Sequence, residues 1–187
     1  MKFIITVFIT LLTLFSVAQD KELFNYINQY RVGNGLDEIK WDNKLSELSI
    51  TQNKKIVDSD SLFHSRKNTY ENLVKSEGVP HDLKLESKFK KFCKKYFNYD
   101  YSFKKDVKTE ELHKICKMYI VFMWDNSKNH RDNLLRDEIV KGSVDSYISS
   151  DFEVVSNTIT IGGVTKTFSN TPSHYKIKFY ATLNMDD

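Results

Sequence analysis

The chain has 187 residues, which is enough for one well-packed domain and too few for two comfortable ones. Its 40% hydrophobic and 28% charged residues, with only 6 Gly and 2 Pro, exclude a disordered or fibrous protein. The formal net charge is only +3, and Lys90, Lys91, Lys94 and Lys95 recur among aromatic residues at helical spacing, so we expect a solvated helix face and no nucleic-acid partner.

The N-terminus has the pattern of a signal peptide over residues 1–18. Lys2 provides the charged start, residues 3–15 are continuously apolar, and residues 16–18 are small enough for a signal peptidase. The apolar run is shorter than the ~20 residues that span a bilayer, and no Cys follows the cleavage site to carry a lipid. We therefore expect an exported protein, extracellular or periplasmic, that begins at Gln19 and keeps no stable membrane anchor.

Two helices are predicted next. The first begins after a capping Asp20, ends near Gly33 and Gly35, and has apolar residues at three- and four-residue steps, namely Leu23, Phe24, Ile27 and Tyr30. Asp42 can cap the second, whose narrower stripe consists of Leu45, Leu48, Gln52 and Ile56. The second helix should lie on the surface with one side buried.

A polar, turn-rich stretch then carries His64 and, seven residues later, Glu71. The two side chains could face one cleft. Alternatively, Glu71 occupies the first turn of a short helix, where the helix dipole favours an acid, and His64 lies in an exposed loop. Spacing alone favours the second interpretation.

Two further helices are predicted between residues 74 and 124. The first has a core-facing set of mostly aromatic residues, Leu85, Phe89, Phe92, Cys93 and Tyr96. Thr109 caps the second, which ends at Trp124 and should be the most buried helix. Cys93 and Cys116 lie on separate helices and either form a disulfide, worth ~3 kcal/mol by the loop-entropy model, or remain two buried thiols.

The periodicity changes to strand after the segment WDNSKNHRDNLL, residues 124–135. Val140, Val144 and Ile148 suggest a strand, and two short strands should flank a turn at Gly162 and Gly163. In the last strand the residues from Tyr175 to Met185 alternate, which predicts one core face and one other face. Helices followed by strands indicate an α+β domain with an antiparallel sheet.

Five blocks in order carry a family resemblance: LFNYINQYRVGNGLDEIKWDNKL, FHS, YENL, WDNSKNHRDNLL and the terminal aromatic strand. This succession resembles the secreted CAP superfamily (cysteine-rich secretory proteins, antigen 5 and pathogenesis-related 1), in its bacterial SCP-like branch. The resemblance implies an α-β-α sandwich with a small antiparallel sheet covered by helices. It also implies one CAP domain over residues 19–187 with an insertion at about 74–117, which could cover the cleft.

The family's cleft presents two His and two Glu, and the resemblance places three of them at His64, Glu71 and His130. The second Glu falls on Ser127, and Tyr70 stands where a glycine usually precedes the first Glu. A structural interpretation competes for the last block: Trp124 in the core, Ser127 as the N-cap of a short helix, and Asn133 bonded to backbone, with His130 ordering the turn. His81, His113 and His174 fall outside the matched positions.

Two functions follow from this site. The favoured one is a non-catalytic binding module for a small apolar or lipid ligand or an extracellular protein partner. The alternative is a hydrolase in which His64 and His130 hold zinc or another divalent cation and Glu71 is the candidate catalytic base. Because a catalytic zinc usually has three protein ligands and Ser127 replaces a carboxylate, we expect binding rather than turnover.

Overall fold

The computed structural model describes residues 20–65, 69–77, 83–102, 108–152, 156–161, 164–169 and 175–187. The predicted signal peptide, His81, His174 and the two-glycine turn at residues 162–163 lie outside these ranges. Among the helices that are described, none is both long and apolar enough to cross a membrane.

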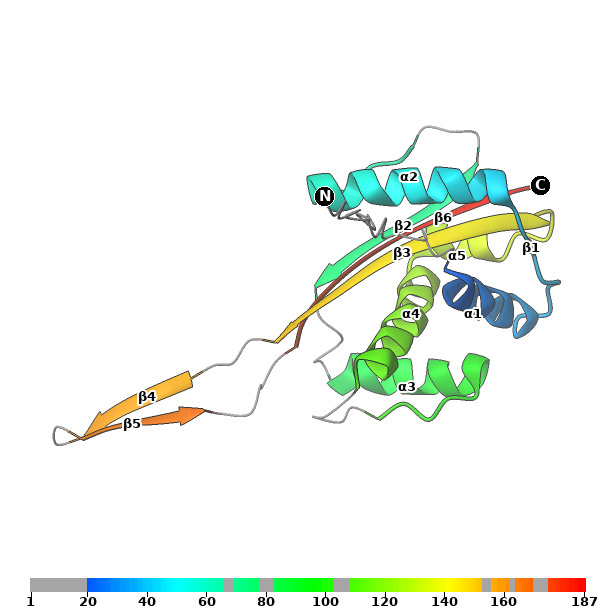
Figure 1. Ribbon diagram of the computed structural model, residues 1–187. Coiled ribbons are helices and arrows are strands. Elements are labelled where there is room, and N and C mark those ends of the chain that lie inside the picture. Colours follow the sequence, from blue (N-terminus) through cyan, green and yellow to red (C-terminus); the bar gives the residue numbers. More distant parts are fainter. Residues whose placement is uncertain are drawn as a thin grey trace, which may run out of the picture.

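The main sheet contains β1 (Lys40–Trp41), β2 (Tyr70–Glu77), β3 (Lys141–Phe152) and β6 (Tyr175–Asp186), in the order β1-β3-β6-β2. The three long strands are antiparallel, as predicted, and the short β1 adds one parallel pair to β3. β4 (Ser156–Ile161) and β5 (Val164–Ser169) form the predicted hairpin, which extends from the ends of β3 and β6 (Figure 1).

Helices cover both faces of this sheet. The helix α2 (Asn43–Ser59) lies alone on one face, whereas α1 (Lys21–Val32), α4 (Thr109–Asn126) and α5 (Lys128–Leu134) lie on the other (Figure 1). The helix α3 (Leu83–Phe97) packs beyond them against α1 and α4. The predicted α+β class and the α-β-α sandwich are confirmed. The insertion at about 74–117 and its role as a cover for the cleft stay predictions, since residues 78–82 and 103–107 lie outside the described ranges.

The outer face of β6 differs from its prediction. Ile177, Phe179, Ala181, Leu183 and Met185 face the main core as expected, but Tyr180, Thr182 and Asn184 on the opposite face are buried too. They are buried because α2 covers that face and presents polar side chains to it. Asn184 donates to Ser49 Oγ on α2 at 3.0 Å and accepts from Thr69 Oγ1 at 2.9 Å.

The predicted caps hold for α1 and α2 and fail for α4. Asp20 accepts a hydrogen bond from Leu23 N at 3.0 Å, and Asp42 accepts from two backbone amides of the first turn of α2. Thr109 is the first residue of α4 and not its cap, since Lys108 occupies the N-cap position without a side-chain bond. The cost of that missing bond is small beside the burial of α4, whose Trp124 is fully buried as predicted.

The two cysteines are free thiols, buried on α3 and α4, as the second of the two predicted alternatives has it. Burial raises the pKa of each thiol to about 12.

The lysines of α3 named above are exposed, which confirms the solvated face. Val140 lies before β3 and is exposed, so the predicted strand begins one residue later than its pattern suggested.

Candidate functional site

Three segments supply the predicted site residues. His64 follows α2 in a loop, Glu71 lies on β2, and Ser127 and His130 lie at the start of α5. We refer to these four residues as the His-Glu site. Because β2 is the edge strand of the sheet, residues from the α2 layer and from the α5 layer can approach each other around it.

Glu71 and His64 are in direct contact. Glu71 Oε2 accepts hydrogen bonds from His64 Nδ1 at 2.8 Å and from Ser65 N at 2.9 Å. Glu71 lies on β2 and pairs with Asn184 of β6. The prediction from spacing, which placed Glu71 in the first turn of a short helix, is therefore wrong. The sequence YENLVKSE hides this strand because polar and charged residues occupy positions on both faces.

The burial of the pair is asymmetric. The Glu71 side chain is 5% exposed, whereas the His64 side chain is 64% exposed. Because a carboxylate only accepts, the shared proton sits on His64 Nδ1, and Nε2 takes no part in the bond to Glu71. Glu71 Oε1 is buried and has no hydrogen-bond partner. The buried Glu71 carboxylate therefore fixes the orientation of the exposed His64 imidazole.

His130 is half-buried at the other wall of the site. Burial lowers the pKa of its imidazole, and the charge of His64 lowers it further. His130 is accordingly neutral at pH 7 and available as a ligand or acceptor.

One buried side chain places His130 beside β2. Asn72, which is fully buried, donates from Nδ2 to the His130 carbonyl oxygen at 2.9 Å. Asn133 Nδ2 in turn donates to Asn72 Oδ1 at 2.9 Å, so the predicted backbone bond of Asn133 is wrong. Ser127 occupies the N-cap position of α5, as predicted, but makes no side-chain capping bond.

Sequence reasoning did not single out Asn72, although it is the third residue of the YENL block. The available signal was its position in the YENL block, directly after the site residue Glu71. Tyr70, which replaces the usual glycine, creates no backbone strain: the positive-φ residues of the described chain are Gly35, Asp60 and Asn98. Its ring instead carries the Arg136 guanidinium 4.5 Å from the centroid.

An apolar pair flanks His64. Leu62 is 49% exposed and Phe63 is 42% exposed, and Gln52 of α2 donates to the Phe63 carbonyl and fixes this loop. The described site thus combines two imidazoles with an apolar border.

The site has fewer metal-ligating side chains than a zinc centre usually has. In the part of the chain that the structure describes, no group of three or more His, Cys, Asp or Glu side chains could hold a metal ion. His64 Nε2 and a His130 nitrogen are the free donors, while Glu71 is buried behind His64. The residues present therefore do not match the three-ligand set of a catalytic zinc.

Comparison with known proteins identifies one family. The family model for CAP, described as the cysteine-rich secretory protein family, matches residues 24–176 and includes all four residues of the His-Glu site. Among solved structures, an outer surface protein from Borrelia burgdorferi is similar with a TM-score of 0.43 and 11% identity, over 89% of this chain and 90% of that chain. No curated protein shows a significant match.

Proposed function

The chain belongs to the CAP family, and from this premise we propose that it is an exported, non-catalytic binding protein whose His-Glu site holds an apolar group of a small ligand or of an extracellular protein. Residues 19–187 form its mature single domain, and the signal peptide of residues 1–18 directs export. In this function the site binds its ligand or partner and makes or breaks no covalent bond in it.

The burial of Glu71 is the observation that carries the proposal. Its Oε2 is already engaged by His64 and Ser65, and its Oε1 is buried. A general base must reach the proton that it removes, within hydrogen-bond distance or through one water. With the second acidic position filled by Ser127, the site presents imidazoles to an occupant and no accessible carboxylate.

The border of the site supports an apolar contact. Leu62 and Phe63 offer exposed apolar surface next to His64, and His130 and His64 offer hydrogen-bonding atoms. Burial of apolar area contributes roughly 25 cal/mol per Å², so even these two side chains can contribute to binding. An occupant with one apolar group and one hydrogen-bonding atom fits this combination.

Native mass spectrometry of protein exported by its host and freshly purified is the test. We expect a co-purifying apolar adduct, or a bound protein, that is lost in a Leu62→Ser, Phe63→Ser double variant. A matched control is Val32→Ser, a change at an equally exposed apolar residue at the end of α1, which should retain the adduct. A spectrum free of any adduct, with no uptake of offered lipids or extracellular proteins, contradicts the proposal. An N-terminus at Gln19 in the same sample tests export.

The alternative function is hydrolysis that depends on a divalent metal. The observation in its favour is the His64–Glu71 bond, because imidazoles that bind metals typically donate their second N–H to a carboxylate. The donor count stands against it. Zinc titration by calorimetry distinguishes the two functions: heat that disappears in a His64→Ala, His130→Ala variant, together with zinc-dependent turnover of peptide or ester substrates, would establish the alternative.

A further inference from the structure

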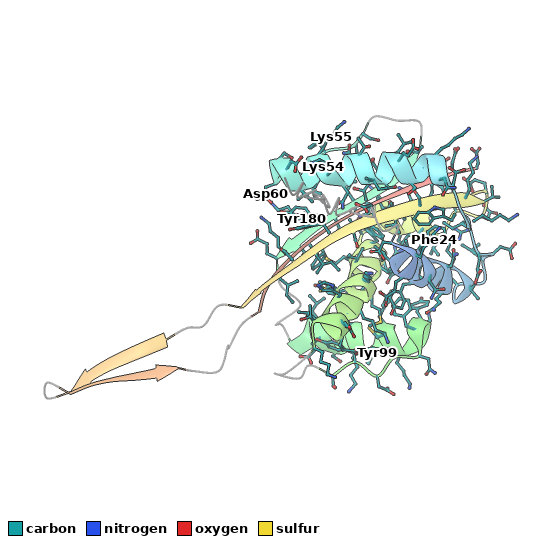
Figure 2. The ribbon with its side chains drawn as sticks, in the orientation of Figure 1. Phe24, Lys54, Lys55, Asp60, Tyr99 and Tyr180 are labelled. Atoms are coloured by element: carbon teal, nitrogen blue, oxygen red, sulfur yellow. The ribbon has the colours of Figure 1, made fainter. Side chains whose placement is uncertain are left out.

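A partly open cavity lies in the helix layer opposite α2, between α1, α4 and the end of α3. Its volume is about 300 Å³, and it is lined by Glu22, Asn25, Tyr26, Gln29, Phe97, Tyr99, Lys114 and Met118. Figure 2 shows Tyr99 on this side of the molecule and Lys54 and Lys55 of α2 on the other. We propose that this α1–α4 cavity binds a small aromatic carboxylate. The proposal is independent of the function of the His-Glu site.

The chain turns sharply to build one wall of the cavity. The helix α3 ends at Phe97, and Asn98 then adopts φ 48°, a left-handed conformation that Asn tolerates better than most residues. The turn is held by Tyr99 N donating to the Cys93 carbonyl at 3.2 Å, and the Tyr99 hydroxyl donates to Glu111. The Tyr99 ring is thereby fixed over the cavity.

Three further lining residues, Tyr26, Phe97 and Met118, are aromatic or apolar, whereas Glu22, Asn25, Gln29 and Lys114 are polar. The rings of Tyr26 and Phe97 meet edge to face with centroids 4.9 Å apart, and Met118 at the base is fully buried. Rings held in this way offer flat, preformed apolar surface to a ligand, and little ordering of side chains is required for binding.

Charge determines which ligand suits the cavity. Glu22 is paired with Lys117 at 3.0 Å and also accepts from the Tyr26 hydroxyl, and Lys117 lies 2.9 Å from Asp20. Half-buried Lys114 has only the Tyr99 ring, 5.0 Å from its Nζ, and no carboxylate of the described chain lies within 4.0 Å of it. In the described chain Lys114 is therefore a cation of the lining without a paired carboxylate, while Glu22, the carboxylate of the lining, is paired with Lys117.

The volume of the cavity limits the class of ligand further. A volume of about 300 Å³ lies at the lower end of ligand pockets, which excludes a sterol or a long acyl chain as a fully enclosed guest. The Gln29 and Asn25 amides at the rim can donate to the second oxygen of a carboxylate. A single ring bearing one carboxylate fills these requirements, with the ring between the aromatic walls and the carboxylate at Lys114.

NMR titration of ¹⁵N-labelled protein with phenylacetate, and with the neutral phenylacetamide as its isostere, tests the proposal. We expect saturable shifts at the amides of Gln29, Tyr99 and Lys114 with phenylacetate and at least about tenfold weaker binding of phenylacetamide, because a charge-assisted bond is lost. Lys114→Gln should reduce phenylacetate affinity by a similar factor. Lys91→Gln, an exposed lysine on α3 outside the cavity, is the matched control and should bind as the unmodified protein does.

Equal binding of the acid and the amide to the unmodified protein would overturn the proposal, and that comparison needs no variant to fold. Shifts confined to residues around His64 and His130, or no saturable shifts at all, would also overturn it. A His64→Ala, His130→Ala variant should bind phenylacetate unchanged. Failure of the His-Glu site to bind any occupant is thus distinguishable from failure of the α1–α4 cavity.

Discussion

Asn72 on β2 donates a hydrogen bond to the carbonyl oxygen of His130 on α5 across 2.9 Å. It joins the edge strand that carries Glu71 to the helix that carries His130, so the two walls of the His-Glu site are connected through one buried amide. Asn133 completes the connection by donating to the same side chain. The spacing between the two walls therefore depends on a residue that is itself fully buried.

Replacing Asn72 with Ala should destabilise the fold and loosen the site. The change removes the two part-buried hydrogen bonds that join β2 to α5 and leaves a small cavity where the fully buried Asn72 side chain was. We expect the free energy of unfolding to fall by about 2–3 kcal/mol in urea denaturation, with an unchanged m-value. The control Asn25→Ala alters an exposed amide and should stay within about 0.5 kcal/mol. Equal stabilities of the two variants would contradict this role.

Arg31 should be the most sensitive charged residue of the core. It is 1% exposed and donates to the carbonyl oxygens of Asp37, Leu134, Arg136 and Ile139 at 2.7–3.3 Å. Arg31→Met preserves much of the volume but leaves those carbonyls unpaired, so we expect a loss of about 3 kcal/mol or more in thermal or urea unfolding.

Two matched variants sharpen this prediction. Arg31→Lys should recover little stability, because an ammonium on a flexible stem cannot reproduce the planar fork of donors. Arg131→Met removes an exposed arginine whose contact is a single carbonyl at 3.3 Å, and it should be nearly neutral. A stability loss for Arg31→Met no larger than for Arg131→Met would show that the carbonyl contacts are unimportant.

Local patterns predicted the features that depend on residues close together in the sequence. The α1 stripe and the Asp20 and Asp42 caps depend on residues a few positions apart, and the structure has them as expected. β6 is central and covered on both sides, so Thr182 and Asn184 are buried although they are polar. Alternation detects an apolar face, and it cannot detect a polar face whose hydrogen bonds are made by a helix distant in sequence.

The site was predictable only through the family resemblance. Spacing alone placed Glu71 in a helix, because YENLVKSE has no clean period of two. The approach of His130 to His64 depends on the strand order, which puts β2 at the sheet edge between the α2 and α5 layers. The orienting role of Glu71 depends on its burial, which no residue pattern contained.

Cys93 and Cys116 should not react with thiol reagents in the folded protein. Both are buried, and burial raises the pKa of each thiol to about 12. The thiolate is the reactive form, and at pH 8 it is then roughly one part in ten thousand. We expect no rapid reaction with Ellman's reagent in buffer and reaction of both thiols in guanidinium. Rapid labelling of the native protein, or an intact mass lower by two hydrogens, would contradict two buried thiols.

His130 should make stability depend on pH in a defined direction. Its pKa in the folded protein is lowered from 6.5 by burial and by the charge of His64. The unfolded chain therefore binds a proton more readily, and stability contributed by neutral His130 is complete above about 6.5 and is lost as the pH falls through the lowered pKa. NMR titration of the imidazole Cε1–H should give a midpoint below 6.5, and urea unfolding should show stability falling over the same interval. His64→Ala removes the repulsion and should raise the midpoint, whereas Lys91→Ala should leave it unchanged. A midpoint that does not move in His64→Ala would mean that the two imidazoles do not share one site.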